Sequence, residues 1–124
     1  GLGDVYKRQP GVHANGSLTL GENIADHGGL QVSYHAFKKA METAPLEVVD
    51  GFTPEQRFFL AYANVWAGNI RPEEILRLTK LDPHSLGKWR VDGALPHIAN
   101  WYEAFNITEQ DSMFVPKEKR VSIW

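Results

Sequence analysis

The fold class follows most directly from residues 22–43, which read ENIADHGGLQVSYHAFKKAMET. Apolar side chains recur there at intervals of three and four residues, as on one face of an α-helix: Leu30, Tyr34, Phe37 and Met41. We therefore predict a helix that begins near Glu22 and ends near Thr43, before the next proline. The adjacent Gly28 and Gly29 weaken a helix, so their presence suggests a close approach by another segment of backbone.

The rest of the chain reads as shorter helices joined by loops. Thr53 and Gln56 occupy the two positions of a capping box, with a proline between them that suits the first helical turn. We expect three further helices: from Pro54 to just before Gly68, over about residues 71–80, and from Pro96 to Asn106. Residues 1–21 contain five glycines and no apolar period, so we expect irregular chain there with a short extended piece at 17–20. The sequence predicts one mainly α unit.

The composition excludes several classes of protein. The 124 residues include 13 basic and 15 acidic side chains, whereas a nucleic-acid-binding domain usually carries a strongly basic balance. No apolar run approaches the roughly 18 residues that span a bilayer. Cysteine is absent, which excludes disulfides and thiolate zinc ligands. We therefore expect no nucleic-acid partner and no membrane segment in this stretch.

Glu22 and Asp26 are the first candidate site residues. They are four residues apart, so a helix directs both carboxylates to the same side, where they repel unless a cation or a metal-bound histidine lies near. The alternative is ordinary: acidic side chains in a first helical turn interact favourably with the helix dipole and face water.

His84 and Arg90 form the second candidate pair, beside a glycine-containing loop. Donors of this kind can stabilise an oxyanion that develops on a substrate carbonyl, although a turn histidine and a surface arginine are the plainer interpretation. None of the five histidines belongs to an H-E-x-x-H motif, so no evident three-ligand zinc site is present.

Taken together, these segments resemble the C-terminal part of the neprilysin-like zinc metallopeptidases, which are gluzincins. The matching motifs follow in the family's order: GENIADHGGL at 21–30, FFL to VW over 58–66, RPE at 71–73, DPHS at 82–85, WRV at 89–91 and the terminal Trp124. The resemblance covers 11–124 and leaves 1–10 as a leader outside the family. It implies the helical C-terminal part of a thermolysin-like (zincin) catalytic domain.

The resemblance also implies roles for individual residues. Glu22 matches the third zinc ligand, and Asp26 matches the aspartate that holds a zinc-bound histidine. His84 matches the histidine that stabilises the tetrahedral transition state, and Arg90 the arginine that binds a substrate carbonyl. One zinc ion is implied, with its other two ligands and the general base on an upstream H-E-x-x-H segment that this sequence lacks.

These observations lead to one functional expectation and one main rival; a third possibility, a free-standing metal-binding protein, is disfavoured because the sequence offers no compact set of ligands. The expectation is a C-terminal fragment of a zinc endopeptidase that cleaves short peptides, inactive alone, with the upstream part of the same polypeptide as its partner. The lack of cysteine places the resemblance in the bacterial branch, whose members occur in the cytoplasm and in the cell envelope or periplasm. The rival is a non-enzymatic helical module that binds a partner through its aromatic surface. If the chain is a fragment, we expect part of an aromatic stripe to remain exposed where the upstream part would pack: Phe37, Phe59, Tyr62 and Trp66, or Trp101 and Trp124.

Overall fold

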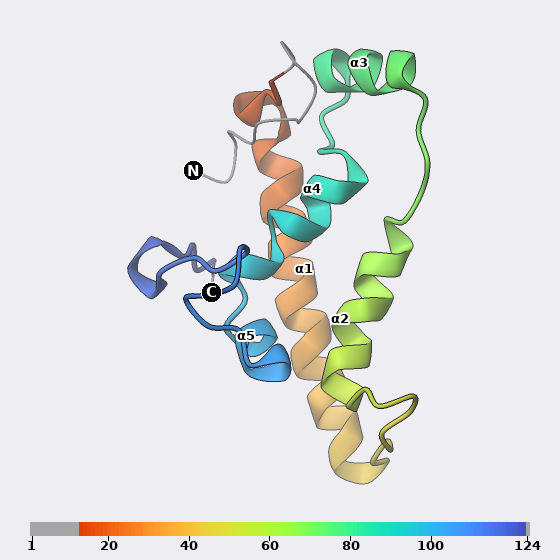
Figure 1. Cartoon of the computed structure of the whole chain (residues 1–124), viewed down its shortest axis with the longest axis vertical. Helices are drawn as coiled ribbons and strands as arrows, with labels where there is room; N and C mark the ends of the chain where they lie inside the picture. Colours follow the sequence, from red (N-terminus) through yellow and green to blue (C-terminus); the bar gives the residue numbers. More distant parts are fainter. Residues whose placement is uncertain (1–12, 124) are drawn as a thin grey trace.

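The computed structural model describes residues 13–123, and these residues form helices and no β-strand. The helices are α1 (Gly16–Thr43), α2 (Pro54–Val65), α3 (Pro72–Leu81), α4 (Gly87–Asp92) and α5 (Ala99–Phe105), with 3-10 turns η1 (Leu95–His97) and η2 (Lys117–Lys119). α1 is the longest helix, α2 runs antiparallel beside it, and α3 lies nearly at right angles to it near its N-terminal end (Figure 1). The short helices α4 and α5 each contact one part of α1. None of the described helices is long and apolar enough to cross a membrane. The predicted mainly α fold is confirmed.

Helix α1 begins six residues earlier than the sequence predicts. The Asn15 side chain accepts a hydrogen bond from the Leu18 backbone N–H at 3.2 Å and so caps a helix that starts at Gly16. The predictions of irregular chain up to residue 21 and of an extended piece at 17–20 are therefore wrong for the described residues. The cap signal, asparagine before glycine and serine, is present in the sequence. The proposed leader at 1–10 lies outside the described residues.

Helix α2 begins where its sequence signals place it. The Thr53 side chain accepts from the Gln56 backbone N–H at 3.2 Å, and the Gln56 side chain accepts from the Thr53 N–H at 3.0 Å. The same Gln56 amide donates to the Ala104 carbonyl oxygen on α5 at 3.0 Å. One side chain therefore caps α2 and ties it to α5.

The later helices agree less closely with the prediction. α3 lies as expected, but α4 occupies a segment to which the sequence assigned no helix. The single helix predicted from Pro96 is divided at Ile98, whose extended backbone separates η1 from α5. α5 does end at Asn106, which adopts a left-handed conformation with φ of 53°.

The core lies where α1, α2 and α5 meet. Its buried apolar side chains come from these three helices, from η1 and from Ile98 between η1 and α5: Leu30, Tyr34, Phe59, Leu95, Ile98, Trp101 and Tyr102. The rings of Tyr34 and Phe59 stack with centroids 5.2 Å apart, which joins α1 to α2. The middle of α1, at Leu30 and Tyr34, is therefore packed against α2 and α5.

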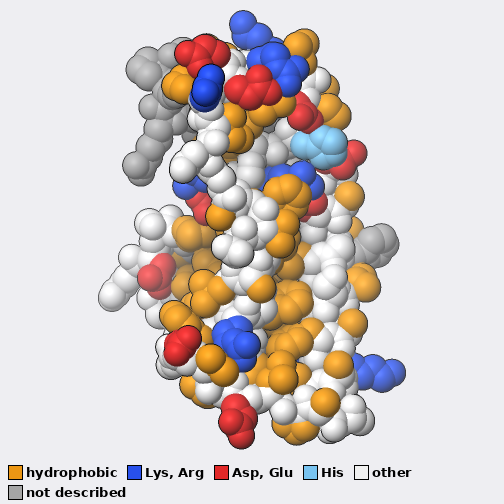
Figure 2. Space-filling model, turned by 90° about the vertical axis from the view of Figure 1, so that its right-hand side faces the viewer, with side chains coloured by type: hydrophobic (Ala, Val, Ile, Leu, Met, Phe, Trp, Pro, Cys, Tyr) orange, Lys and Arg blue, Asp and Glu red, His pale blue; other side chains and the backbone are white. Residues whose placement is uncertain are grey.

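The exposed large apolar side chains are mostly aliphatic, although Phe52 is exposed as well. Phe59 and Trp101 are buried and Tyr62 and Trp66 are half-buried, so the expected aromatic patch is not formed by them; Trp124 lies outside the described residues. The exposed aliphatic side chains include Val32, Leu60 and Val65. Figure 2 shows a band of hydrophobic side chains on one face of the molecule. A groove of about 430 Å³ between α1 and α2 passes Gly29, and apart from the neighbouring backbone of α1 no described atom lies within 4 Å of the position that a Cβ would occupy there. The close backbone contact predicted at the glycine pair is thus absent at Gly29 among the described residues.

His27 on α1 is fully buried, and neither ring nitrogen has a hydrogen-bond partner among the described residues. Its ring centroid lies 6.2 Å from that of His97, whose Nδ1 accepts from the Val121 N–H at 2.9 Å. Burial, and then the charge of His97, lower the pKa of His27 below its ordinary value of 6.5.

This buried histidine predicts sensitivity to acid. Below pH 6.5 the unfolded chain takes up a proton at His27 that the folded chain resists, so the free energy of unfolding should fall as the pH falls from about 6.5. We expect His27→Asn to flatten this dependence in urea unfolding measured between pH 5 and 8. An equally steep loss of stability in His27→Asn would contradict this origin.

Candidate active site

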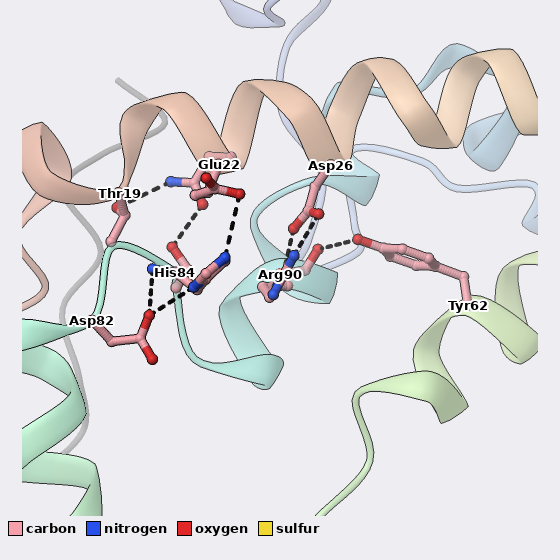
Figure 3. A network of polar contacts seen from close by, with 9 residues as sticks. Thr19, Glu22, Asp26, Tyr62, Asp82, His84 and Arg90 are labelled. Atoms are coloured by element: carbon pink, nitrogen blue, oxygen red, sulfur yellow. Dashed lines mark hydrogen bonds and ion pairs between the residues drawn. The ribbon is translucent and has the colours of Figure 1, made fainter.

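Glu22 and Asp26 lie on the same side of α1, as their spacing predicts; Glu22 faces the segment that connects α3 to α4, and Asp26 faces α4 (Figure 3). Glu22 Oε2 lies 3.4 Å from His84 Nε2, and both Asp26 oxygens bind Arg90. The four residues selected from the sequence therefore meet at one place, although Asp26 and Arg90 are 64 residues apart.

His84 is oriented by Asp82, a residue that the sequence analysis did not select. Asp82 Oδ1 accepts from the His84 backbone N–H at 2.8 Å and lies 2.7 Å from His84 Nδ1. Because an ionised carboxylate only accepts, this contact places a proton on Nδ1 and leaves Nε2 facing Glu22. The His84 N–H and then its ring hold the pKa of Asp82 below the usual value, which keeps this carboxylate ionised.

Arg90 is held by two independent contacts. Its Nε and one terminal nitrogen each donate to an Asp26 oxygen at 2.6 Å, in a bidentate pair whose side chains are only 14% and 16% exposed. Its guanidinium also lies 3.7 Å from the centre of the Trp66 ring, a cation–π contact. The hydrogen bonds to Asp26 raise the pKa of Arg90 above its ordinary value. The arginine is therefore a fixed charge and not a flexible surface group.

Tyr62 on α2 contacts the backbone of α4, the helix that carries Arg90. Its hydroxyl donates to the Arg90 carbonyl oxygen at 2.9 Å, which ties α2 to α4. Burial, and then the charge of Asp26, raise the pKa of Tyr62, so the hydroxyl keeps the proton that it donates. The sequence does not indicate the contacts of Tyr62 and Trp66 with Arg90, because no spacing rule links residues on these two helices.

The buried ion pair leads to a stability prediction. Asp26→Asn removes the charge that compensates Arg90, so we expect a loss of about 2–4 kcal/mol in the free energy of unfolding, measured with urea. Asp50→Asn is a matched control, since Asp50 is exposed in a turn and asparagine tolerates its left-handed backbone. A loss for Asp26→Asn no larger than that of the control would show that the pair adds nothing.

Zinc ligation can be tested against the donor atoms that are present. A catalytic zinc takes three protein ligands and a water, and no group of three suitable side chains occurs among residues 13–123. Glu22 nevertheless suits one position, because its side chain is 45% exposed and its contact with His84 is longer than a normal hydrogen bond. Each Asp26 oxygen accepts one bond from Arg90 and retains a lone pair that a histidine N–H could use. These residues fit one part of a zinc site.

The family to which the chain belongs follows from comparison with known proteins. The family model described as Peptidase family M13 matches residues 3–121. The chain belongs to peptidase family M13. Human neprilysin is 41% identical over 118 residues, and the rabbit neprilysin is 39% identical over the same length. The resemblance to a neprilysin-like zinc metallopeptidase is thus confirmed, and the chain corresponds to the C-terminal region.

Solved structures of this family share the fold. A crystal structure of Mycobacterium tuberculosis zinc metalloprotease ZMP1 in complex with an inhibitor superposes with a TM-score of 0.93 at 35% identity and covers 99% of this chain. PepO from Lactobacillus rhamnosis gives 0.74 at 33% identity over 95% of the chain. The chain spans 15% of human neprilysin and 20% of the ZMP1 chain. The family match begins at residue 3 and so includes most of the first ten residues. The proposed boundary between a leader at 1–10 and the peptidase region at 11–124 stays a prediction.

Proposed function

We propose that this chain forms one wall of the active site of a zinc endopeptidase that hydrolyses short peptides. The observation that carries the proposal is the convergence of Glu22, His84 and the Asp26–Arg90 pair at one place on α1. The two remaining zinc ligands and the general base are assigned to an H-E-x-x-H segment in another part of the complete polypeptide. When bound, zinc polarises the scissile carbonyl and activates a water molecule.

In this proposal Glu22 contributes the third ligand, and Asp26 acts through its neighbours. An Asp26 oxygen accepts from the ring N–H of a ligand histidine, which fixes the orientation of that ring and raises its basicity. The same carboxylate accepts two hydrogen bonds from Arg90 at 2.6 Å. Asp26 therefore orients both the zinc-binding histidine and the arginine that binds the substrate.

Arg90 binds the substrate. A guanidinium has five N–H donors, of which Asp26 uses two, so three remain for a peptide carbonyl oxygen. Because Trp66 and Asp26 restrict the side chain, little conformational entropy is lost when a peptide binds.

His84 acts on the transition state. With Nδ1 bonded to Asp82, a protonated Nε2 donates to the oxygen that becomes negative when water attacks the carbonyl. The ionised Asp82 stabilises the imidazolium and prevents rotation of the ring. The position of Nε2 beside Glu22 places this donor next to the zinc-binding carboxylate.

The test is a peptidase assay of the complete protein. A quenched fluorescent peptide of about ten residues should be cleaved, a chelator should abolish cleavage, and added zinc should restore it. Hydrolysis that ignores the chelator, or no hydrolysis by zinc-loaded protein, would contradict the proposal and favour a helical binding module.

The isolated 124-residue chain should behave differently. Glu22 alone is a poor zinc site, because an ion bound by one carboxylate keeps most of its hydration, and the sequence offers no H-E-x-x-H base. We expect calorimetry to show no submicromolar zinc binding and the same peptide to remain intact. Chelator-sensitive turnover lost in Glu22→Ala would show that the chain holds a complete site.

A further inference from the structure

Three side chains form a line of hydrogen bonds next to the candidate active site. The Ser85 hydroxyl donates to Asn23 Oδ1 at 2.7 Å, and the Asn23 amide nitrogen donates to the Thr19 hydroxyl oxygen at 3.2 Å. The Thr19 hydroxyl in turn donates to the Asn15 carbonyl oxygen at 3.3 Å (Figure 3 shows Thr19 and its neighbours). The line starts in the loop before α4 and ends at the N-terminus of α1.

The direction of every bond in this line is fixed. Thr19 has a single hydroxyl proton, which goes to Asn15, so the Thr19 oxygen must accept from the nitrogen of Asn23. The oxygen of the Asn23 amide therefore faces Ser85, and Ser85 must be the donor. Thr19 is buried and the other two contacts are partly buried, so these hydrogen bonds are shielded from competition by water.

The bond between Asn23 and Ser85 lies beside the reacting groups. Asn23 follows Glu22 on α1, and Ser85 follows His84 in the loop, so the bond joins the two chain segments 62 residues apart that carry those groups. The Glu22–His84 contact itself is 3.4 Å long between half-exposed side chains, and such surface contacts contribute little. The shorter and less exposed Ser85–Asn23 bond is better suited to hold the loop.

A small cavity supports the same interpretation. Asn23 and Ser85 line this cavity together with Asp26 and Arg90. The Ser85–Asn23 hydrogen bond and the Asp26–Arg90 ion pair therefore lie on the walls of the same cavity. A shift of the loop at Ser85 would move His84 relative to both Glu22 and Arg90.

We infer that Ser85 is a positioning residue whose hydrogen bond to Asn23 sets the distance between His84 and Glu22. It touches no reacting atom and acts through the backbone that it shares with His84. The inference rests on the proposed function, in which His84 must meet the oxyanion within hydrogen-bond distance. A misplacement of about 1 Å in such a group can lower a rate by about 10²-fold.

The test compares two variants in the complete zinc-loaded enzyme. Ser85→Ala should lower kcat by about 10- to 100-fold, while KM and bound zinc change less than about twofold. Ser85→Thr keeps the hydroxyl and should recover most of the rate. Ser112→Ala, an exposed serine in the loop after α5, is the control and should behave as wild type.

A double variant separates positioning from general support. If Ser85 acts only through His84, then Ser85→Ala adds almost nothing to the loss already caused by His84→Ala. Additive losses, an unchanged kcat in Ser85→Ala, or a rate that Ser85→Thr does not recover would each overturn the inference.

Amide hydrogen exchange gives a result that does not depend on catalysis. In the complete protein, Ser85→Ala should speed exchange at residues 84–86 by about tenfold or more and leave α2 unchanged. If wild type shows no chelator-sensitive hydrolysis, the proposed function fails, and this exchange decides the role of the bond alone. Unchanged exchange at these residues would overturn the role.

Discussion

Glu22→Gln should remove zinc and activity from the complete enzyme. The amide has nearly the size of the carboxylate but no charge, so the ion loses one of its three protein ligands and the charge that it contributes. Changes to residues that merely support a ligand typically cost 10–100-fold in metal affinity or activity, so we expect the loss of the ligand itself to exceed about 100-fold in both. Zinc content by mass spectrometry and kcat/KM with the quenched peptide are the measurements.

Glu42→Gln is the matched control for this variant. Glu42 is an exposed glutamate at the far end of the same helix, so the change in charge and size is identical. It should retain wild-type zinc and rate. Wild-type zinc content in Glu22→Gln would remove Glu22 from the metal site.

His84→Ala should lower kcat by about 10²–10³-fold, the usual cost of one lost oxyanion donor, with little change in KM. The split follows from the proposed roles: His84 Nε2, which lies 3.4 Å from Glu22 Oε2, would donate to the oxyanion in the transition state, whereas Arg90 would bind the substrate in the ground state as well. Steady-state kinetics on the complete enzyme are the measurement.

His35→Ala provides the control for this variant, because His35 is exposed on α1, away from the loop that carries His84. It should keep the wild-type kcat. A rise in KM for His84→Ala at constant kcat would instead give the histidine a role in binding the ground state.

Local signals in the sequence predicted part of the fold. The capping box at Thr53 and Gln56 placed the start of α2 correctly, because these contacts lie within four residues. The start of α1 was missed because apolar periodicity begins only after several turns, whereas the Asn15 cap does not depend on it. The six-residue α4 is too short to show a period at all.

The candidate site was predicted to a similar extent. The spacing of Glu22 and Asp26 and the loop position of His84 were visible in the sequence, and the structure brings them together with Arg90. Asp82, Trp66 and Ser85 were not selected. The contacts of Trp66 and Ser85 cross between helices and depend on tertiary packing, which no short spacing encodes. The pairing of Asp82 with His84 could have been read from the D-P-H sequence, in which an aspartate two residues before a backbone N–H forms a local turn.

Zinc-edge anomalous diffraction from crystals of the complete protein would locate the zinc ion relative to Glu22. We expect one strong peak about 2.0–2.2 Å from a Glu22 carboxylate oxygen, with Asp26 still paired to Arg90 and an Asp26 oxygen within hydrogen-bond distance of a ligand histidine. A zinc ion bound elsewhere, with Glu22 outside its coordination sphere, would show that this chain does not ligate the catalytic metal.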